Sequence, residues 1–213
     1  MGHAATYDEA LCAESYYMAA KAHHVCDARF IMEELNTNSR EVASFGHNKL
    51  LLTPKQKERL VELGAQTEDF KQVESAEGTH WLRGKDGIMP IREGWHEVRH
   101  NVFLYILRQK FGTSAPMESA ARQSMEALVT LAKEKGELTL IAEHRRADKF
   151  WGDGFDGEGY NVLGRILTQI MLEQAGLSEK VPMKPWSELV AIMGQPNCGL
   201  VMYETHPKYL EDT

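Results

Sequence analysis

The chain has 213 residues, of which 43% are hydrophobic, and a formal net charge of −7. This length is typical of one domain that buries about 70% of its unfolded surface, and this composition excludes a disordered chain. The negative charge argues against a general nucleic-acid-binding surface, which needs a basic footprint, although a small pocket can still be locally positive. No apolar run approaches the roughly 20 residues of a membrane-spanning helix.

The first residues and the cysteines indicate the compartment. The N-terminal stretch lacks a basic region followed by an apolar one, so we expect no secretory signal and a cytoplasmic or nuclear location. Cys12, Cys26 and Cys198 form no even disulfide framework, which favours a reducing compartment. The spacing of Cys12, His23, His24 and Cys26 matches no standard zinc site, so we expect no metal and no cofactor.

Helical patterns dominate the chain from its beginning. Helix-favouring and periodic apolar residues predict helices over residues 8–24, 27–35 and 40–45. Thr53-Pro54 is a strong start signal, because threonine caps a helix and proline fits its first turn; this helix should end at Gly64. Further helices are predicted over residues 93–111, 117–135, 161–174 and 186–193, with short strands over 138–142 and 200–203.

Residues 68–93 are the hardest to assign. They contain Gly78, Gly84 and Gly87 among mixed charges, which predicts a loop. Loops of such length are usually insertions or lids. The elements together predict an α+β, mainly α-helical fold with a few short strands, arranged as a single domain.

Two groups of residues are candidates for chemistry. Glu14 and Lys21 lie seven residues apart, close to two helical turns, so both project from nearly the same stripe of one helix. A carboxylate and an amine in that position can tune each other's pKa, or they can form an ordinary surface salt bridge. The segment 150–161 alternates glycines with acids and aromatics directly before a helix, which suits a close ligand contact or an anion at the helix N-terminus. A tight turn with a core Trp151 is the alternative.

These segments follow one another in an order that resembles the NADAR, or YbiA-like, family of N-glycosidases. The resemblance covers about residues 10–176, and it rests on Glu14-Ser15-Tyr16-Tyr17 with Ala20-Lys21, Gly46-His47-Asn48, Trp95-His96-Glu97-Val98-Arg99 with Val102-Phe103, Lys110-Phe111, Ile141-Ala142-Glu143, Trp151-Gly152-Asp153-Gly154, and Gly159-Tyr160-Asn161-Val162-Leu163-Gly164 with Leu167. It implies a domain over residues 1–177, an insertion or lid over 49–92, and an extension over 178–213 packed on the same domain. His47 replaces the arginine usual beside Asn48, which weakens a phosphate contact there.

The family resemblance implies a hydrolase that breaks the bond between ribose C1 and a nitrogen. We expect this chain to remove ADP-ribose from ADP-ribosylated guanine, so that its substrate is an ADP-ribose-containing small molecule or an ADP-ribosylated nucleic acid. One alternative is an N-glycosidase acting on the phosphoribosylamino-pyrimidine intermediates of riboflavin synthesis. Another is an ADP-ribose-binding module without turnover. Oligomeric state is open.

The resemblance also implies roles for individual residues. Cleavage of the C1–N bond builds positive charge on the ribose, which a carboxylate stabilises. Glu14 and Asp153 are therefore expected to contact ribose and transfer protons, and Lys21 to be either a nucleophile that forms a Schiff base or a phosphate-binding cation. The substrate-binding positions implied are Tyr17, Asn48, Trp95, Glu143, Trp151, Gly152, Gly154, Asn161 and Gly164. We expect all of them to converge on one pocket.

Overall fold

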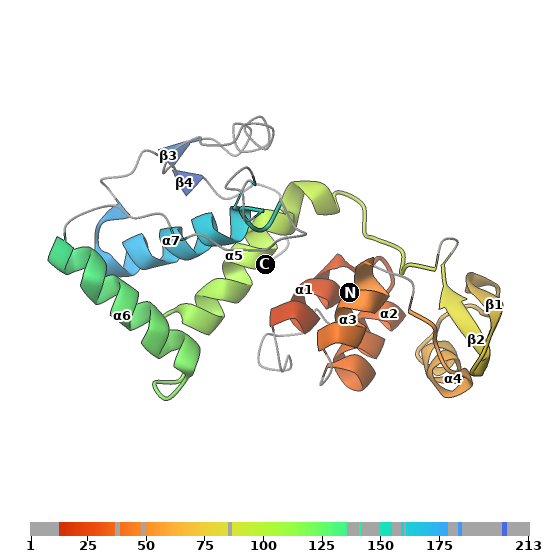
Figure 1. Cartoon of the computed structure of the whole chain (residues 1–213). Coiled ribbons are helices and arrows are strands. Elements are labelled where there is room, and N and C mark those ends of the chain that lie inside the picture. Colours follow the sequence, from red (N-terminus) through yellow and green to blue (C-terminus); the bar gives the residue numbers. More distant parts are fainter. Residues whose placement is uncertain are drawn as a thin grey trace. The chain divides into compact units, whose positions relative to one another are not determined.

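The computed structural model describes residues 13–36, 39–47, 50–84, 87–135, 141, 150–154, 159, 161–178, 183–184 and 202–203. The chain divides into two compact units, Met1–Val102 and Phe103–Thr213. The mainly helical α+β prediction is confirmed, because the described strands form only an antiparallel hairpin and one short parallel pair among helices (Figure 1). None of the helices in the described residues combines the length and the hydrophobicity needed to span a bilayer.

The first unit begins with a group of short helices. They are α1 (Ala13–Lys21), α2 (Val25–Phe30), the π-helix η2 (Ile31–Leu35) and α3 (Ser39–His47). Their buried core includes Met18, Phe30, Ile31, Leu35, Val42 and Phe45. Helix α1 approaches α3 so closely that a Cβ on Gly46 would overlap the Met18 sulfur, so any larger residue there requires the buried Met18 side chain to move.

Helix α4 (Pro54–Glu62) starts where the sequence predicts it to start. The Thr53 hydroxyl accepts a hydrogen bond from the Gln56 N–H at 3.3 Å, and the Gln56 side chain accepts one from the Thr53 N–H at 2.9 Å. This reciprocal capping box satisfies two donors that an uncapped helix end leaves free. After the helix, Gly64 takes a φ of +108° and turns the chain.

The loop predicted over residues 68–93 is wrong for most of its length. A 3₁₀ turn, η3 (Thr67–Asp69), leads into the antiparallel hairpin of β1 (Phe70–Ser75) and β2 (Gly78–Arg83). Trp81 pairs with Leu52 through two backbone hydrogen bonds and lies under the Lys57 ammonium at 3.8 Å. These contacts join the hairpin to the segment around α4, beside which it lies in Figure 1.

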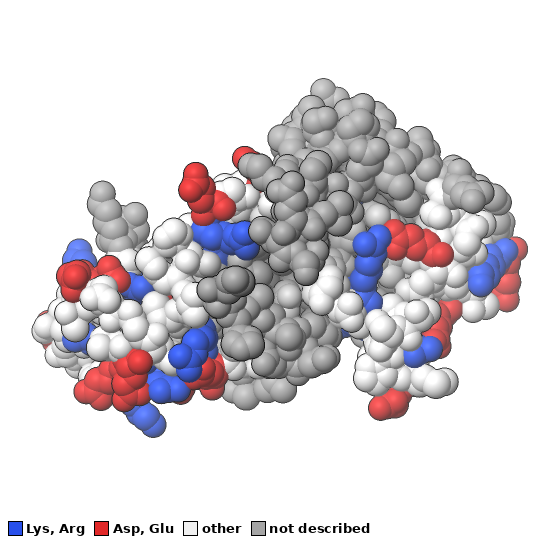
Figure 2. Space-filling view, turned by 180° about the vertical axis from the view of Figure 1, so that it is seen from behind, with Lys and Arg blue, Asp and Glu red and all other residues white. Residues whose placement is uncertain are grey.

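Ion pairs join α4 and the hairpin to the preceding helices of the first unit. The Arg83 guanidinium donates to both carboxylate oxygens of Asp27, at 2.8 and 3.1 Å, and both side chains are almost fully buried. On the surface, Arg59 of α4 bonds Glu33 and Glu34 of η2 at 2.6 and 3.0 Å. Acidic and basic side chains lie next to one another over the described surface seen in Figure 2.

Helix α5 (Trp95–Phe111) contributes its residues up to Val102 to the first unit and the rest to the second. The second unit also contains α6 (Ala120–Lys135), α7 (Val162–Ala175), and the parallel pair β3 (Met183–Lys184) and β4 (Met202–Tyr203). Its core is formed by Leu104, Leu107, Met125, Val129, Ala132, Val162, Ile166, Ile170, Met171 and Leu172. Strand β4 falls within the predicted strand, whereas the predicted helix over 186–193 and nearly all of the predicted strand over 138–142 lie outside the described residues.

Candidate functional site

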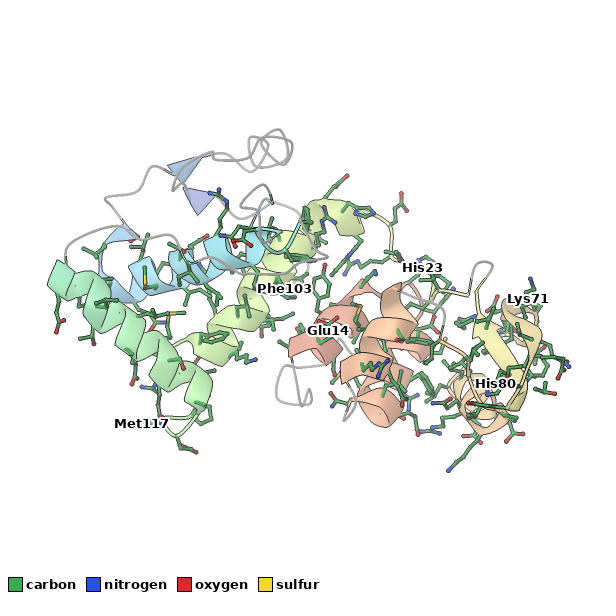
Figure 3. The ribbon with its side chains drawn as sticks, in the orientation of Figure 1. Glu14, His23, Lys71, His80, Phe103 and Met117 are labelled. Atoms are coloured by element: carbon green, nitrogen blue, oxygen red, sulfur yellow. The ribbon has the colours of Figure 1, made fainter. Side chains whose placement is uncertain are left out.

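Lys21 is a buried amine at the end of α1. Its side chain is only 4% exposed, and its Nζ donates a hydrogen bond of 2.7 Å to the carbonyl oxygen of Gly46 in α3. Glu14 lies in the first turn of the same helix, as Figure 3 shows. The burial of Lys21 excludes the ordinary surface salt bridge that the sequence left open.

The environment of Lys21 favours its neutral form. Burial lowers the pKa of its amine to about 8, against the attraction of the Glu14 carboxylate, which raises the pKa, while the charge of Arg99 lowers the pKa further. About a quarter of the Lys21 side chains would then be neutral at pH 7.5, compared with about one in a thousand for a lysine of ordinary pKa. A neutral amine has a lone pair, so this neutral fraction of Lys21 has the electronic state that a nucleophile requires.

Aromatic packing joins α1 to the beginning of α5. The rings of Tyr17 and Trp95 meet edge to face, with centroids 4.9 Å apart, and both side chains are buried. The Arg92 N–H donates to the Lys21 carbonyl at 3.0 Å, which fixes the chain just before α5 against the end of α1. Trp95 is 3% exposed and therefore acts here as a structural anchor of the Lys21 environment.

Arg99 is a further charged residue near Lys21, one to which the sequence motifs assigned no role. It lies one helical turn after Trp95 in α5 and is half-buried. Burial lowers the pKa of its guanidinium, and the neighbouring Tyr17 opposes that shift. The four-residue spacing from Trp95 could have identified it, because residues at that spacing share a helix face.

In the second unit, Trp151 to Gly154 form a loop that is bonded to the start of α7. The N–H groups of Asn161, Val162 and Leu163 donate to the carbonyls of Gly152, Phe150 and Trp151 at 3.1, 3.2 and 3.0 Å. Asp153 and the two flanking glycines are buried, and Gly154 takes a φ of +76°. The Trp151 ring packs against Phe103 at 4.6 Å and Phe150 at 4.9 Å.

Asn161 and Gly164 hold a second chain segment on α7. Asn161 takes a left-handed φ of 51°, and its side-chain amide donates to the Ile141 carbonyl at 2.8 Å. The Ile141 N–H in turn donates to the Thr168 hydroxyl at 2.9 Å. A Cβ on Gly164 would overlap the Ile141 carbonyl oxygen and the Asn161 amide. This asparagine and glycine therefore build the scaffold around the Trp151 loop.

The bonds at the start of α7 bear on where an anion can bind. Helix N-termini attract phosphates through N–H groups that lack a partner within the helix. In α7 the N–H groups of residues 161–163 already donate to carbonyls of the Trp151 loop. They are therefore not available to an anion unless that loop is displaced.

The predicted site residues fall in both units. The first unit brings Tyr17, Lys21 and Trp95 together, with Glu14 on the same helix. The second brings together Trp151, Gly152, Asp153, Gly154, Asn161 and Gly164. Asn48 and Glu143 lie outside the described residues. That all of these act on one substrate stays a prediction. Within the described part of the chain, no group of three or more His, Cys, Asp or Glu side chains is placed to hold a metal ion.

Comparisons with known proteins bear on the predicted family. The chain is 32% identical over 87 residues to N-glycosidase YbiA of Escherichia coli, which is 41% of this chain and 47% of that protein. It is 37% identical over 91 residues to riboflavin biosynthesis protein VVA0006 of Vibrio vulnificus, 43% of this chain and 21% of that protein. It is 31% identical over 144 residues to the chloroplastic riboflavin biosynthesis protein PYRR of Arabidopsis thaliana, 62% of this chain and 22% of that protein.

These similarities confirm the resemblance to YbiA-like proteins that the motifs predict. The chain spans about half the length of YbiA and about a fifth of the two riboflavin biosynthesis proteins. No family model matches the chain. No solved structure matches it either.

Proposed function

We propose that this chain is an N-glycosidase that hydrolyses the bond between ribose C1 and a nitrogen, and that its substrate is ADP-ribosylated guanine, from which it releases ADP-ribose. The observation that carries the enzyme class is the buried Lys21 amine with its pKa of about 8, set on a helix with Glu14. The similarity to N-glycosidase YbiA supports the same class. The choice of guanine follows the resemblance described above.

The reaction proceeds by covalent catalysis. The neutral Lys21 amine attacks C1, the C1–N bond to the base breaks, and a carboxylic acid, Glu14 or Asp153, protonates the leaving nitrogen. The amine loses a proton, the sugar ring opens, and C1 becomes a Schiff base of Lys21. Water then adds to that carbon and releases the sugar with the free amine. Positive charge that develops on the ribose is stabilised by the second carboxylate.

Covalent participation of Lys21 has a direct test. Borohydride added during turnover should reduce the Schiff base, so mass spectrometry should find one ribose-containing adduct, on Lys21. Lys21→Arg should lower kcat at least about 1000-fold, because a guanidinium is not a nucleophile at neutral pH. Lys57→Arg is the matched control and should keep full activity, because Lys57 lies over Trp81 in the insertion.

The opposite outcome defines the other role of Lys21. If no adduct is trapped and Lys21→Arg retains a substantial rate, Lys21 is a cation that binds phosphate. The chemistry then passes to Glu14 and Asp153 acting on water, as in glycosidases with two carboxylates. In that case Glu14→Gln and Asp153→Asn should each abolish turnover while the lysine variant does not.

The riboflavin-pathway intermediate is the second candidate substrate, because two of the similar proteins are named riboflavin biosynthesis proteins. Incubation with ADP-ribosylated single-stranded DNA and, separately, with phosphoribosylamino-pyrimidine should separate the two. Release of ADP-ribose, with unmodified guanine restored in the DNA, supports the proposal. Release of free pyrimidine alone reassigns the substrate, and release of neither by a protein that binds ADP-ribose leaves a binding module.

A further inference from the structure

The contact between Tyr17 and Trp95 brings two cations, Lys21 and Arg99, near each other. Tyr17 and Lys21 are four residues apart on α1, and Trp95 and Arg99 are four residues apart on α5. Residues at this spacing lie on the same face, one turn from each other. The centroids of the two aromatic rings are 4.9 Å apart, so the faces of α1 and α5 that carry Lys21 and Arg99 lie against each other. Arg99 is close enough for its charge to act on the Lys21 amine.

The two cations differ in what they can offer a ligand. The Lys21 ammonium donates to the Gly46 carbonyl, and of the described charged groups, Glu14 attracts it and Arg99 repels it. Burial lowers the pKa of both cations, which means that each loses hydration in the folded protein. An anion bound at Arg99 would offset the like-charge repulsion between the two cations. A guanidinium presents a planar fork of donors that matches two oxygens of a phosphate.

Other positions that the family resemblance suggests for phosphate are less suited to it. Position 47 is a histidine, which lacks the planar fork of donors that an arginine presents. At the start of α7 the N–H groups of residues 161–163 are already bonded to the Trp151 loop. Arg99 is a half-buried permanent cation whose charge acts on the candidate nucleophile.

We propose that Arg99 binds the 5′-phosphate of the substrate's ribose, next to Lys21 and to the Tyr17–Trp95 contact. The inference rests on the proposed function in that it assumes a phosphoribosyl ligand. Both candidate substrates carry a phosphate at that carbon, so the subsite is common to both. Arg99 is thus a binding residue that orients C1 toward the Lys21 amine, and it takes no part in proton transfer.

The first test is calorimetric binding of ribose 5-phosphate, ADP-ribose and ribose to the full chain. Arg99→Gln should weaken binding of both phosphorylated ligands at least about tenfold and leave ribose binding unchanged, and Arg99→Lys should restore part of the loss. Arg29→Gln is the matched control, because it removes one arginine from an exposed pair with Glu33. Equal affinities of the wild-type and Arg99→Gln proteins for the phosphorylated ligands would overturn the proposal.

A second measurement reports on the charge directly. An anion at Arg99 should raise the pKa of Lys21, which otherwise senses burial, Glu14 and Arg99. At pH 8 the wild-type protein should therefore take up part of a proton when it binds ribose 5-phosphate, seen as a binding enthalpy that depends on the buffer. Lys21→Met should bind without that uptake. Absence of uptake by the wild-type protein would contradict the placement beside Lys21.

These binding results are independent of turnover. A protein that binds phosphorylated ribose through Arg99 but cleaves the C1–N bond of neither substrate refutes the N-glycosidase proposal and keeps the phosphate subsite. A protein that cleaves that bond with an unchanged KM in Arg99→Gln refutes the subsite and keeps the enzyme. Circular dichroism and the melting temperature of Arg99→Lys show whether a loss of binding reflects misfolding.

Discussion

Burying the Lys21 amine lowers the stability of the folded protein, and the pH dependence of the free energy of unfolding measures that cost. Its folded pKa of about 8 lies below its ordinary value of 10.5, so the folded chain binds fewer protons than the unfolded chain between those two pH values. The contribution of Lys21 to the free energy of unfolding therefore rises with pH between those two values. Below pH 8 the full free-energy cost of burying the charged amine is present. Lowering the pKa of an amine by one costs about 1.4 kcal/mol, so burying the charged Lys21 costs about 3 kcal/mol.

Lys21→Met should therefore stabilise the protein at pH 7. Removing the buried charge increases the free energy of unfolding, but the Gly46 carbonyl loses its donor, which costs about 1–3 kcal/mol. The net increase should be about 1 kcal/mol. The difference between the variant and wild type should shrink, or reverse sign, by pH 10. Urea unfolding at both pH values measures it. A difference that is the same at pH 7 and pH 10 would show that the amine is not desolvated.

The ion pair of Asp27 and Arg83 poses the opposite case, in which the charges are buried together. Asp27→Ala leaves the Arg83 guanidinium in the interior with the half-exposed Asp69 as its remaining carboxylate. We expect a loss of about 3–5 kcal/mol, measured by urea unfolding. The double variant Asp27→Ala with Arg83→Met should be more stable than Asp27→Ala alone, because it removes the buried charge that Asp27 no longer balances. If it is less stable, the pair contributes packing rather than charge compensation.

At the scale of an element, Gly164 of α7 leaves room for the Ile141 carbonyl and the Asn161 amide, which are bonded to each other. In Gly164→Ala the new Cβ would overlap the Ile141 carbonyl and the Asn161 amide, so the bond between those two groups should break. We expect a loss of about 1–3 kcal/mol in stability and a fall of kcat/KM of at least about tenfold, because Asp153 lies in the attached loop.

The control for this substitution lies at the other end of the helix. Gly176 takes a φ of +70° at the C-terminal cap of α7, with no atom near its Cβ position. Gly176→Ala should therefore cost about 1 kcal/mol through backbone strain alone and leave kcat/KM unchanged. Equal activity losses in the two variants would mean that α7 stability, rather than the loop, limits catalysis.

At the scale of the whole molecule, the candidate catalytic residues come from different units of the chain. Lys21 belongs to the first unit and Asp153 to the second. If both act on one bound substrate, their contributions to kcat/KM should be strongly non-additive. Lys21→Ala should cost at least about 1000-fold and Asp153→Asn about 100- to 10,000-fold, and the double variant little more than the worse single one. Multiplicative losses would mean that the two residues act independently.

The described surface carries both acidic and basic side chains. Acidic and basic side chains are interspersed in Figure 2, and Arg59 with Glu33 and Glu34 is one such group. The positive charge that matters for the proposed substrate lies instead at two partly or fully buried positions, Lys21 and Arg99. Burial protects such charges from screening by salt, so ligand binding there should respond to individual cations more than to the net charge of the chain.

Local chemistry was sufficient to predict several elements from the sequence. Thr53-Pro54 encodes the start of α4 through a capping box within four residues, and the apolar periodicity of residues 161–174 encodes α7. The order of the short motifs indicated the family resemblance. These features need only neighbours in the chain, so the sequence by itself determines them.

Contacts between distant residues decided the rest. The hairpin over residues 70–83 has few β-branched residues, and Trp81 on Leu52 and Arg83 on Asp27 stabilise it, over separations that no local pattern reveals. The state of Lys21 was likewise undetermined, since burial and Glu14 shift its pKa in opposite directions. The tertiary structure determines whether burial or Glu14 has the larger effect on the pKa, because desolvation depends on how completely α3 and α5 exclude water from the end of α1.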